Sequence, residues 1–126
     1  MNRRIAIVGA PSSIGIRPYD TGEARHLDRA PGVLRQLGIV ERLDAIDLGD
    51  VTPPAYRDYA RPPGRARNQP EVSEYCTSLA DCIAMGVAQD RFVVLVGGDC
   101  SIVLGALLGT KRAVDGPVGV VYVDGR

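Results

Sequence analysis

The feature that most constrains the fold is a continuous apolar run at Phe92 to Val96, followed at once by the turn sequence Gly-Gly-Asp-Cys-Ser at residues 97–101. A run of β-branched and aliphatic residues without polar alternation is typical of a strand covered on both faces. Such strands occur in parallel sheets that lie between two layers of helices. The sequence therefore predicts an α/β fold with a mainly parallel sheet in a three-layer α/β/α arrangement.

Short apolar runs and helical periodicity supply the other elements of this sheet. Strands are predicted at residues 5–8, 45–51, 92–96 and 118–123, and helices over residues 31–40, 70–88 and 102–113. Gly38 is expected to end or bend the first helix. The last two strands and the helix between them would form a βαβ unit with a right-handed crossover. Asp47 and Asp50 are expected to face solvent or cap a turn rather than bind metal.

The helix predicted over residues 70–88 has the clearest amphipathic pattern. Its apolar face is formed by Val72, Tyr75, Leu79, Cys82, Ile83 and Val87. This face is expected to pack against the sheet. Cys76, Cys82 and Met85 are interpreted as core residues rather than as metal ligands.

Residues 52–70 interrupt the regular elements with five prolines and five charges. This density of prolines predicts a loop, and its cluster of Arg61, Arg65 and Arg67 is expected to be solvated. The residues on both sides are ordinary for one globular core, so residues 1–126 are interpreted as a single domain that contains this loop.

Composition excludes several classes of function. Fifteen basic and fifteen acidic residues cancel, so no net field attracts nucleic acid or an anionic membrane. No apolar stretch approaches the roughly 20 residues that span a bilayer. The amino terminus lacks a signal-peptide pattern, and three cysteines form neither a CxxC pair nor an even disulfide set. A cytoplasmic location is predicted.

The loop after the first strand, GAPSSIGIRPYDTG, resembles at first glance the phosphate loop of short-chain dehydrogenases. That pattern requires glycines for close approach to a pyrophosphate. Ser13 stands where a glycine is required, and Pro18 falls where the following helix should be under way. An ordered loop without a dinucleotide is therefore favoured.

The turn at residues 97–101 is the strongest candidate for chemistry. Gly97 and Gly98 allow a sharp turn, and Asp99 can accept hydrogen bonds from the first amides of the following helix. Cys100 and Ser101 would then stand at the carboxyl edge of the sheet, where open α/β sheets place their active sites. A capped connection without chemistry is the alternative.

Cys100 could also act as a nucleophile, because a helix amino terminus favours a thiolate. A base is missing from the pattern, however. His26 is the one histidine of the sequence and is predicted to be an exposed residue on a loop before the first helix.

Two sequence segments resemble the arginase and agmatinase family of ureohydrolases. VLVGGDCSIVLGALLG at 94–109 is similar to the segment with the family's Gly-Gly-Asp-His-Ser turn, and VGVVYVDG at 118–125 to the start of its Asp-Ala-His-x-Asp motif. RAPGVLRQLGIVERL at 29–43 is similar to the family's first helix. The resemblance implies that residues 1–126 are the amino-terminal part of an arginase-like fold, a single but partial domain whose sheet is incomplete.

The resemblance also implies a reaction and a cofactor. Family members use two manganese ions bridged by a hydroxide, which attacks the guanidinium carbon of a small molecule such as arginine or agmatine and releases urea. A metal-activated hydroxide suits this reaction because guanidinium is a poor electrophile. Arginine, agmatine, guanidinobutyrate and formiminoglutamate all stay open as substrates, and a homo-oligomer is an expected assembly.

The ligand positions of the family are only partly kept. Cys100 stands at the first histidine ligand, within the turn residues Gly97, Gly98, Asp99 and Ser101. Asp124 matches the first aspartate of the second motif, Gly125 replaces its alanine, and Arg126 stands where the second histidine belongs. The metal ligands implied for this chain are therefore Asp124 and, in altered form, Cys100.

These replacements change the expected chemistry. A thiolate is a softer donor that suits zinc better than manganese, and arginine remains protonated and cannot bind a metal. We therefore expect that this polypeptide alone does not hydrolyse guanidino substrates. The alternative function is a degenerate, non-catalytic arginase-like interaction domain.

Overall fold

A sheet of three parallel strands forms the centre of the computed structural model, which describes residues 3–58 and 60–125. The strands are β1 (Ile5–Ala10), β2 (Ile46–Asp50) and β3 (Phe92–Gly97), in the order β2-β1-β3. β1 pairs with β3 in continuous register from Ile5 opposite Phe92 to Ala10 opposite Gly97, whereas its register with β2 shifts between Ile7 and Gly9. The predicted parallel sheet is confirmed.

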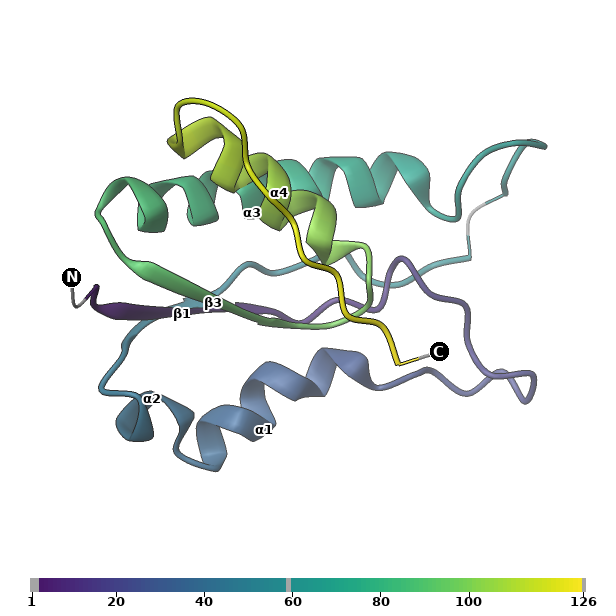
Figure 1. Cartoon of the computed structure of the whole chain (residues 1–126). Helices are drawn as coiled ribbons and strands as arrows, with labels where there is room; N and C mark the ends of the chain where they lie inside the picture. Colours follow the sequence, from purple (N-terminus) through teal and green to yellow (C-terminus); the bar gives the residue numbers. More distant parts are fainter. Residues whose placement is uncertain (1–2, 59, 126) are drawn as a thin grey trace.

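Helices cover both faces of this sheet (Figure 1). They are η1 (Leu27–Arg29), α1 (Ala30–Gln36), α2 (Ile39–Arg42), α3 (Gln69–Ala88) and α4 (Ile102–Ala113). In Figure 1, α1 and α2 lie below the sheet and α3 and α4 lie above it. The three-layer α/β/α arrangement is therefore confirmed.

The first predicted helix is divided at Gly38, as its sequence indicates. Gly38 has a φ of 81°, a left-handed conformation that separates α1 from α2. Pro31 lies in the first turn of α1, where a missing N–H costs nothing, and it is buried. Val33 and Leu37 remain 47% and 65% exposed, so the apolar face of α1 is only partly covered.

The core lies between the sheet and α3. Its buried side chains are Val8, Ala10, Ile14, Tyr75, Leu79 and Ile83. Tyr75 also donates a hydrogen bond of 2.6 Å to the carbonyl oxygen of Val51, which ties α3 to the end of β2, and burial raises the pKa of its hydroxyl. The predicted apolar face of α3 is confirmed.

Met85 is the exception among the predicted core residues. Cys76 is buried and Cys82 packs against the core, but the Met85 side chain is 62% exposed. It lies two residues after Ile83, which places it on the opposite side of the helix. The prediction that Met85 fills the core is wrong.

The fourth predicted strand is not formed. Residues 117–125 are extended but pair with no described strand, and Val121 and Val123 are 92% and 89% exposed. Figure 1 shows this segment running back across the outside of α4. Because a β-strand needs a hydrogen-bonded neighbour, an apolar run alone does not make one, and the predicted βαβ unit lacks its second strand.

The helices α3 and α4 touch through glycines. A Cβ atom at Gly109 would lie 2.5 Å from the carbonyl oxygen of Ala80 and 2.7 Å from Cβ of Ile83. A Cβ atom at Gly105 would lie 3.0 Å from the carbonyl oxygen of Cys76 and 3.0 Å from side-chain atoms of Leu79 in the same helix. The close contact of the two helices therefore depends on small residues in α4. In the described part of the chain, none of the helices is both long and apolar enough to cross a bilayer.

We predict that Gly109→Ala destabilises the protein by about 1–3 kcal/mol, because the new methyl group overlaps the α3 backbone. Gly32→Ala in α1 is the matched control: no atom lies within 4 Å of its Cβ position, so it should be neutral or stabilising by up to about 1 kcal/mol. Urea denaturation measures both. Equal effects of the two substitutions would contradict the packing described.

Candidate functional site

The strand order defines one topological switch point at the carboxyl edge of the sheet. From β1 the chain passes to β2 on one side and then returns to β3 on the other. The carboxyl ends of β1 and β3 therefore form the switch point at which open α/β sheets bind ligands. The loop after β1, residues 11–16, and the turn after β3, residues 97–101, meet there.

Asp99 joins these two segments. Its side chain is 3% exposed and accepts hydrogen bonds from Ser12 Oγ at 3.2 Å, from the Gly15 amide at 3.1 Å and from the Ser101 amide at 2.9 Å. The Asp99 amide in turn donates to the carbonyl oxygen of Ser12 at 2.9 Å. Ser101 immediately precedes α4, so Asp99 accepts a bond from the amide before the helix and not, as predicted, from the first amides of the helix, and its bonds to the β1 loop were not predicted.

Gly97 and Gly98 make the sharp turn that the sequence indicates. Gly98 has a φ of 131°, and a Cβ atom there would lie 2.4 Å from the carbonyl oxygen of Ala10 and 2.9 Å from that of Ser12. Only glycine allows the backbone of the turn to approach the β1 loop this closely. The loop itself is irregular, and no helix starts until Leu27, which disfavours a dinucleotide phosphate loop.

The two candidate metal ligands lie on different segments. The Cys100 side chain is exposed just before α4, and Asp124 is exposed in the extended segment 117–125. Arg126 lies outside the described residues. The Ser101 hydroxyl oxygen is buried and has no hydrogen-bond partner in the described part of the chain.

The donor set does not fit a manganese pair. Within residues 3–58 and 60–125, no group of three His, Cys, Asp or Glu side chains is placed to hold one ion. Cys100 is a soft donor, and Asp99 already uses its carboxylate on three hydrogen-bond donors of this chain. No step of a reaction is therefore assigned to a metal held by these residues alone.

Within the described residues, the structure places no histidine beside Cys100 that could act as the general base of a cysteine nucleophile. His26 is exposed, as predicted, and lines a pocket to which Cys100 does not contribute. The other two cysteines are less suited to reaction, because burial raises the pKa of the Cys76 and Cys82 thiols. Cys76 also donates a hydrogen bond of 3.3 Å to the carbonyl oxygen of Ser101.

Asp47 and Asp50 bind an arginine that the sequence pattern did not connect to them. Arg35 of α1 donates to both Asp47 oxygens at 2.8 and 2.9 Å and to Asp50 at 2.5 Å. Asp47 also accepts a bond from the Gly49 amide, in agreement with the turn-capping prediction. The hydrogen bonds that Arg35 donates lower the pKa of Asp47, and donating to both carboxylates raises the pKa of Arg35.

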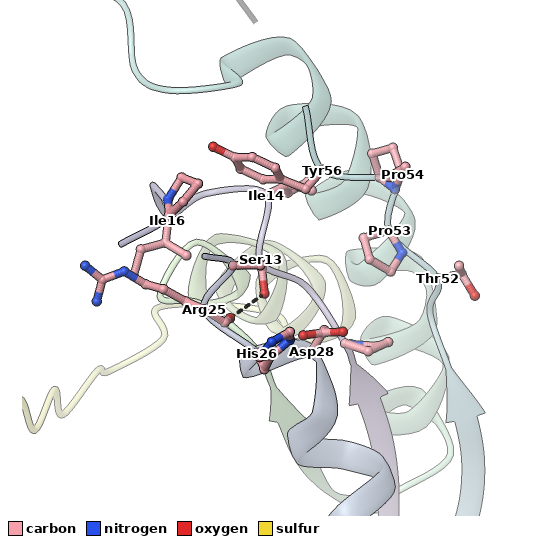
Figure 2. A pocket seen from close by; sticks show the side chains of 14 residues that line it. Ser13, Ile14, Ile16, Arg25, His26, Asp28, Thr52, Pro53, Pro54 and Tyr56 are labelled. Carbon is pink, nitrogen blue, oxygen red and sulfur yellow. Dashed lines mark hydrogen bonds between the residues drawn. The ribbon is translucent and has the colours of Figure 1, made fainter. Parts of the chain in front are cut away.

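A pocket lies on the β2 side of the same edge (Figure 2). It has a volume of about 480 Å³ and is lined by residues from three loops, within ranges 11–18, 24–28 and 52–56. No sequence motif indicated it, because its lining residues come together only through the sheet order. None of residues 97–101 lines it.

We predict that Asp99→Asn lowers the free energy of unfolding by about 1–3 kcal/mol, because an amide nitrogen cannot accept a bond from a backbone N–H. Whichever way the amide is oriented, either Ser101 or Gly15 loses its acceptor. Asp115→Asn is the control, since Asp115 is exposed after α4. Equal stabilities of the two variants in urea would contradict the role of Asp99.

We predict a pH-dependent contribution from Asp47. Its pKa is lowered in the folded state, so its stabilisation is present above the ordinary pKa of about 4 and is lost as the pH falls through the lower folded value. Asp47→Asn should thus cost less than about 1 kcal/mol at pH 7, and the difference from the wild type should shrink at acid pH.

The control for this measurement is Asp20→Asn, which removes an exposed carboxylate paired with Arg17. Urea denaturation at a series of pH values gives the free energies. A wild type and Asp47→Asn variant that differ equally at every pH would contradict the prediction.

Comparison with known proteins identifies the fold. The model of the Arginase family matches residues 3–125. The arginase of Bacillus caldovelox is 34% identical over 120 residues, which cover 90% of this chain and 40% of the relative, and human Arginase-1 is 31% identical over 129 residues, which cover 98% of this chain and 37% of the relative. The chain therefore spans about two fifths of the length of these curated relatives.

Solved structures agree with these matches. The native structure of the Bacillus caldovelox arginase has a TM-score of 0.73 and 32% identity, covering 88% of this chain and 37% of that one. The Bacillus subtilis arginase has a TM-score of 0.71 and 25% identity, covering 90% of this chain and 36% of that one. Because the family model spans nearly the whole chain, the protein belongs to the arginase family.

Proposed function

We propose that this chain provides the amino-terminal part of a ureohydrolase active site, one that hydrolyses a C–N bond of a linear guanidino compound such as arginine or agmatine. The observation that carries this proposal is the location of the Gly-Gly-Asp-Cys-Ser turn. In this chain, a member of the arginase family, the turn lies at the switch point between β1 and β3, held there by Asp99.

Manganese is the metal expected for such a site, with Cys100 and Asp124 at positions of family ligands. A thiol and one carboxylate supply too few hard donors for a pair of manganese ions. We therefore propose that residues 1–126 alone are inactive on guanidino substrates. A cytoplasmic location and assembly into a homo-oligomer are part of the same proposal.

A non-catalytic interaction domain is the alternative function. Two features favour it: Cys100 stands where the family has a histidine ligand, and the apolar side chains of Val121 and Val123 are exposed. The coding sequence after Arg126 separates the two functions: a continuing frame with an Asp-x-Asp pair favours the enzyme, and a natural stop favours the interaction domain.

We predict that the purified chain releases no urea from L-arginine or agmatine when MnCl₂ is supplied, and that it retains less than one manganese ion per chain after gel filtration. A colorimetric urea assay and elemental analysis give the two results. The arginase of Bacillus caldovelox, assayed in parallel, is the positive control. Manganese-dependent urea release by the 126-residue chain would overturn the inactivity proposal.

A chimera tests the active-site proposal itself. In it, this chain replaces the matching amino-terminal part of the Bacillus caldovelox arginase. With Cys100→His and Arg126→His, the chimera should release urea. Without these two substitutions, its activity should be lower by more than about 10-fold, because even mutations of residues that only support a metal ligand cost about that much. The proposal would be contradicted if the chimera with both substitutions folded and bound manganese but released no urea.

A further inference from the structure

The pocket in Figure 2 shares the β1 loop with the switch point between β1 and β3 but includes none of residues 97–101. It opens beyond the carboxyl ends of β1 and β2, and its volume of about 480 Å³ lies in the range of roughly 300–1,000 Å³ that small-molecule sites occupy. Nothing in the proposed hydrolysis uses it. A ligand bound there would not contact the turn at residues 97–101, none of which lines the pocket.

The walls of the pocket are mainly apolar and built on constrained backbone. They include Pro53, Pro54 and the ring of Tyr56, together with Ile14, which lies beside Tyr56 and is 2% exposed. Prolines fix the backbone φ, so part of the wall is preformed and needs little ordering when a ligand binds. Such walls suit the alkyl or aryl part of a small ligand.

The lining of the pocket contains one carboxylate and one arginine, so its formal charges cancel and the direction of each side chain decides which ligand it can pair with. Asp28 is the one carboxylate of its lining, and it forms no ion pair with a residue of the described ranges. Arg25, the one arginine of the lining, is held by neutral partners: its Nε donates to the Arg17 carbonyl oxygen at 2.9 Å, and its guanidinium lies 4.4 Å from the centroid of the Tyr19 ring. Figure 2 shows this guanidinium directed away from Asp28.

A second polar group is left without a partner. The Tyr56 hydroxyl oxygen is buried and makes no hydrogen bond within the described residues. Figure 2 shows Tyr56 and Ile16 on one side of the pocket and His26 and Asp28 on the other. Ser13 lies between them in this view, and its hydroxyl donates a hydrogen bond of 3.1 Å to the Arg25 carbonyl oxygen.

We propose that this pocket binds a small organic amine whose ammonium group pairs with Asp28 and whose apolar body lies along Ile14 and the prolines. An anionic analogue of the same shape is rejected, because it would place a second negative charge beside the Asp28 carboxylate. The site is independent of the metal ligands, so it is expected in the chain as it stands.

The experiment titrates the ¹⁵N-labelled 126-residue chain with 2-phenylethylamine, 2-phenylethanol and phenylacetate. Amide signals of Ile14, Ile16 and Tyr56 should shift most with the amine, less with the alcohol and least with the acid. Asp28→Asn should weaken amine binding by about three- to fivefold, as expected for a partly exposed ion pair, and should remove the preference for the amine over the alcohol. Asp115→Asn is the matched charge control and should change nothing.

Ala55→Leu provides a second variant that does not depend on charge. Ala55 lines the pocket and is exposed. A larger side chain there should fill the space and weaken the binding of all three ligands without disturbing the core. Phenylacetate binding as tight as that of the amine would overturn the proposal. Shifts that persist unchanged in both Asp28→Asn and Ala55→Leu would also overturn it, because they would report non-specific surface binding.

Discussion

The buried carboxylate of Asp99 is the interaction on which the arrangement at the carboxyl edge of the sheet depends. It joins residues separated by 87 positions in the sequence, Ser12 and Asp99, and it accepts three hydrogen bonds. Burying a carboxylate is costly unless its oxygens are bonded, so this site requires all of its donors. The absence of a side chain at Gly15 and Gly98 lets the two segments come close enough to supply them.

This interaction separates the structural part of the turn from its chemical part. Asp99 faces into the protein and holds the β1 loop, whereas Cys100 faces solvent. A replacement at Cys100 therefore changes the candidate metal ligand without disturbing the buried bonds of its neighbour. This explains how the chain keeps an arginase-family fold over residues 3–125 although its ligand motifs are altered.

The central strand of the sheet is buried much more than its two edge strands. β1 is central and is buried from Ala6 to Ala10, whereas β3 is buried only at Val96 and β2 contains no buried residue. Apolar side chains at Leu104 and Val121 are also exposed. The hydrophobic pattern of the sequence thus provides for more burial than these described elements achieve, in agreement with a chain that spans about two fifths of its relatives.

The sequence by itself determined the fold class, the positions of three strands and the long helix, and the family, because each depends on local periodicity or on a contiguous motif. It also located the break at Gly38, since a left-handed residue favours glycine wherever it occurs. It could not decide whether residues 118–123 pair as a strand, because pairing needs a neighbour that no local pattern specifies.

Only the tertiary structure decided the bonds of Asp99 to Ser12 and Gly15, the Arg35 ion pairs and the pocket beside β2. Each joins segments that are far apart in the chain, and the strand order β2-β1-β3 brings them together. A sequence pattern records the chemistry of its residues, but their distances in space follow from the order and register of the strands.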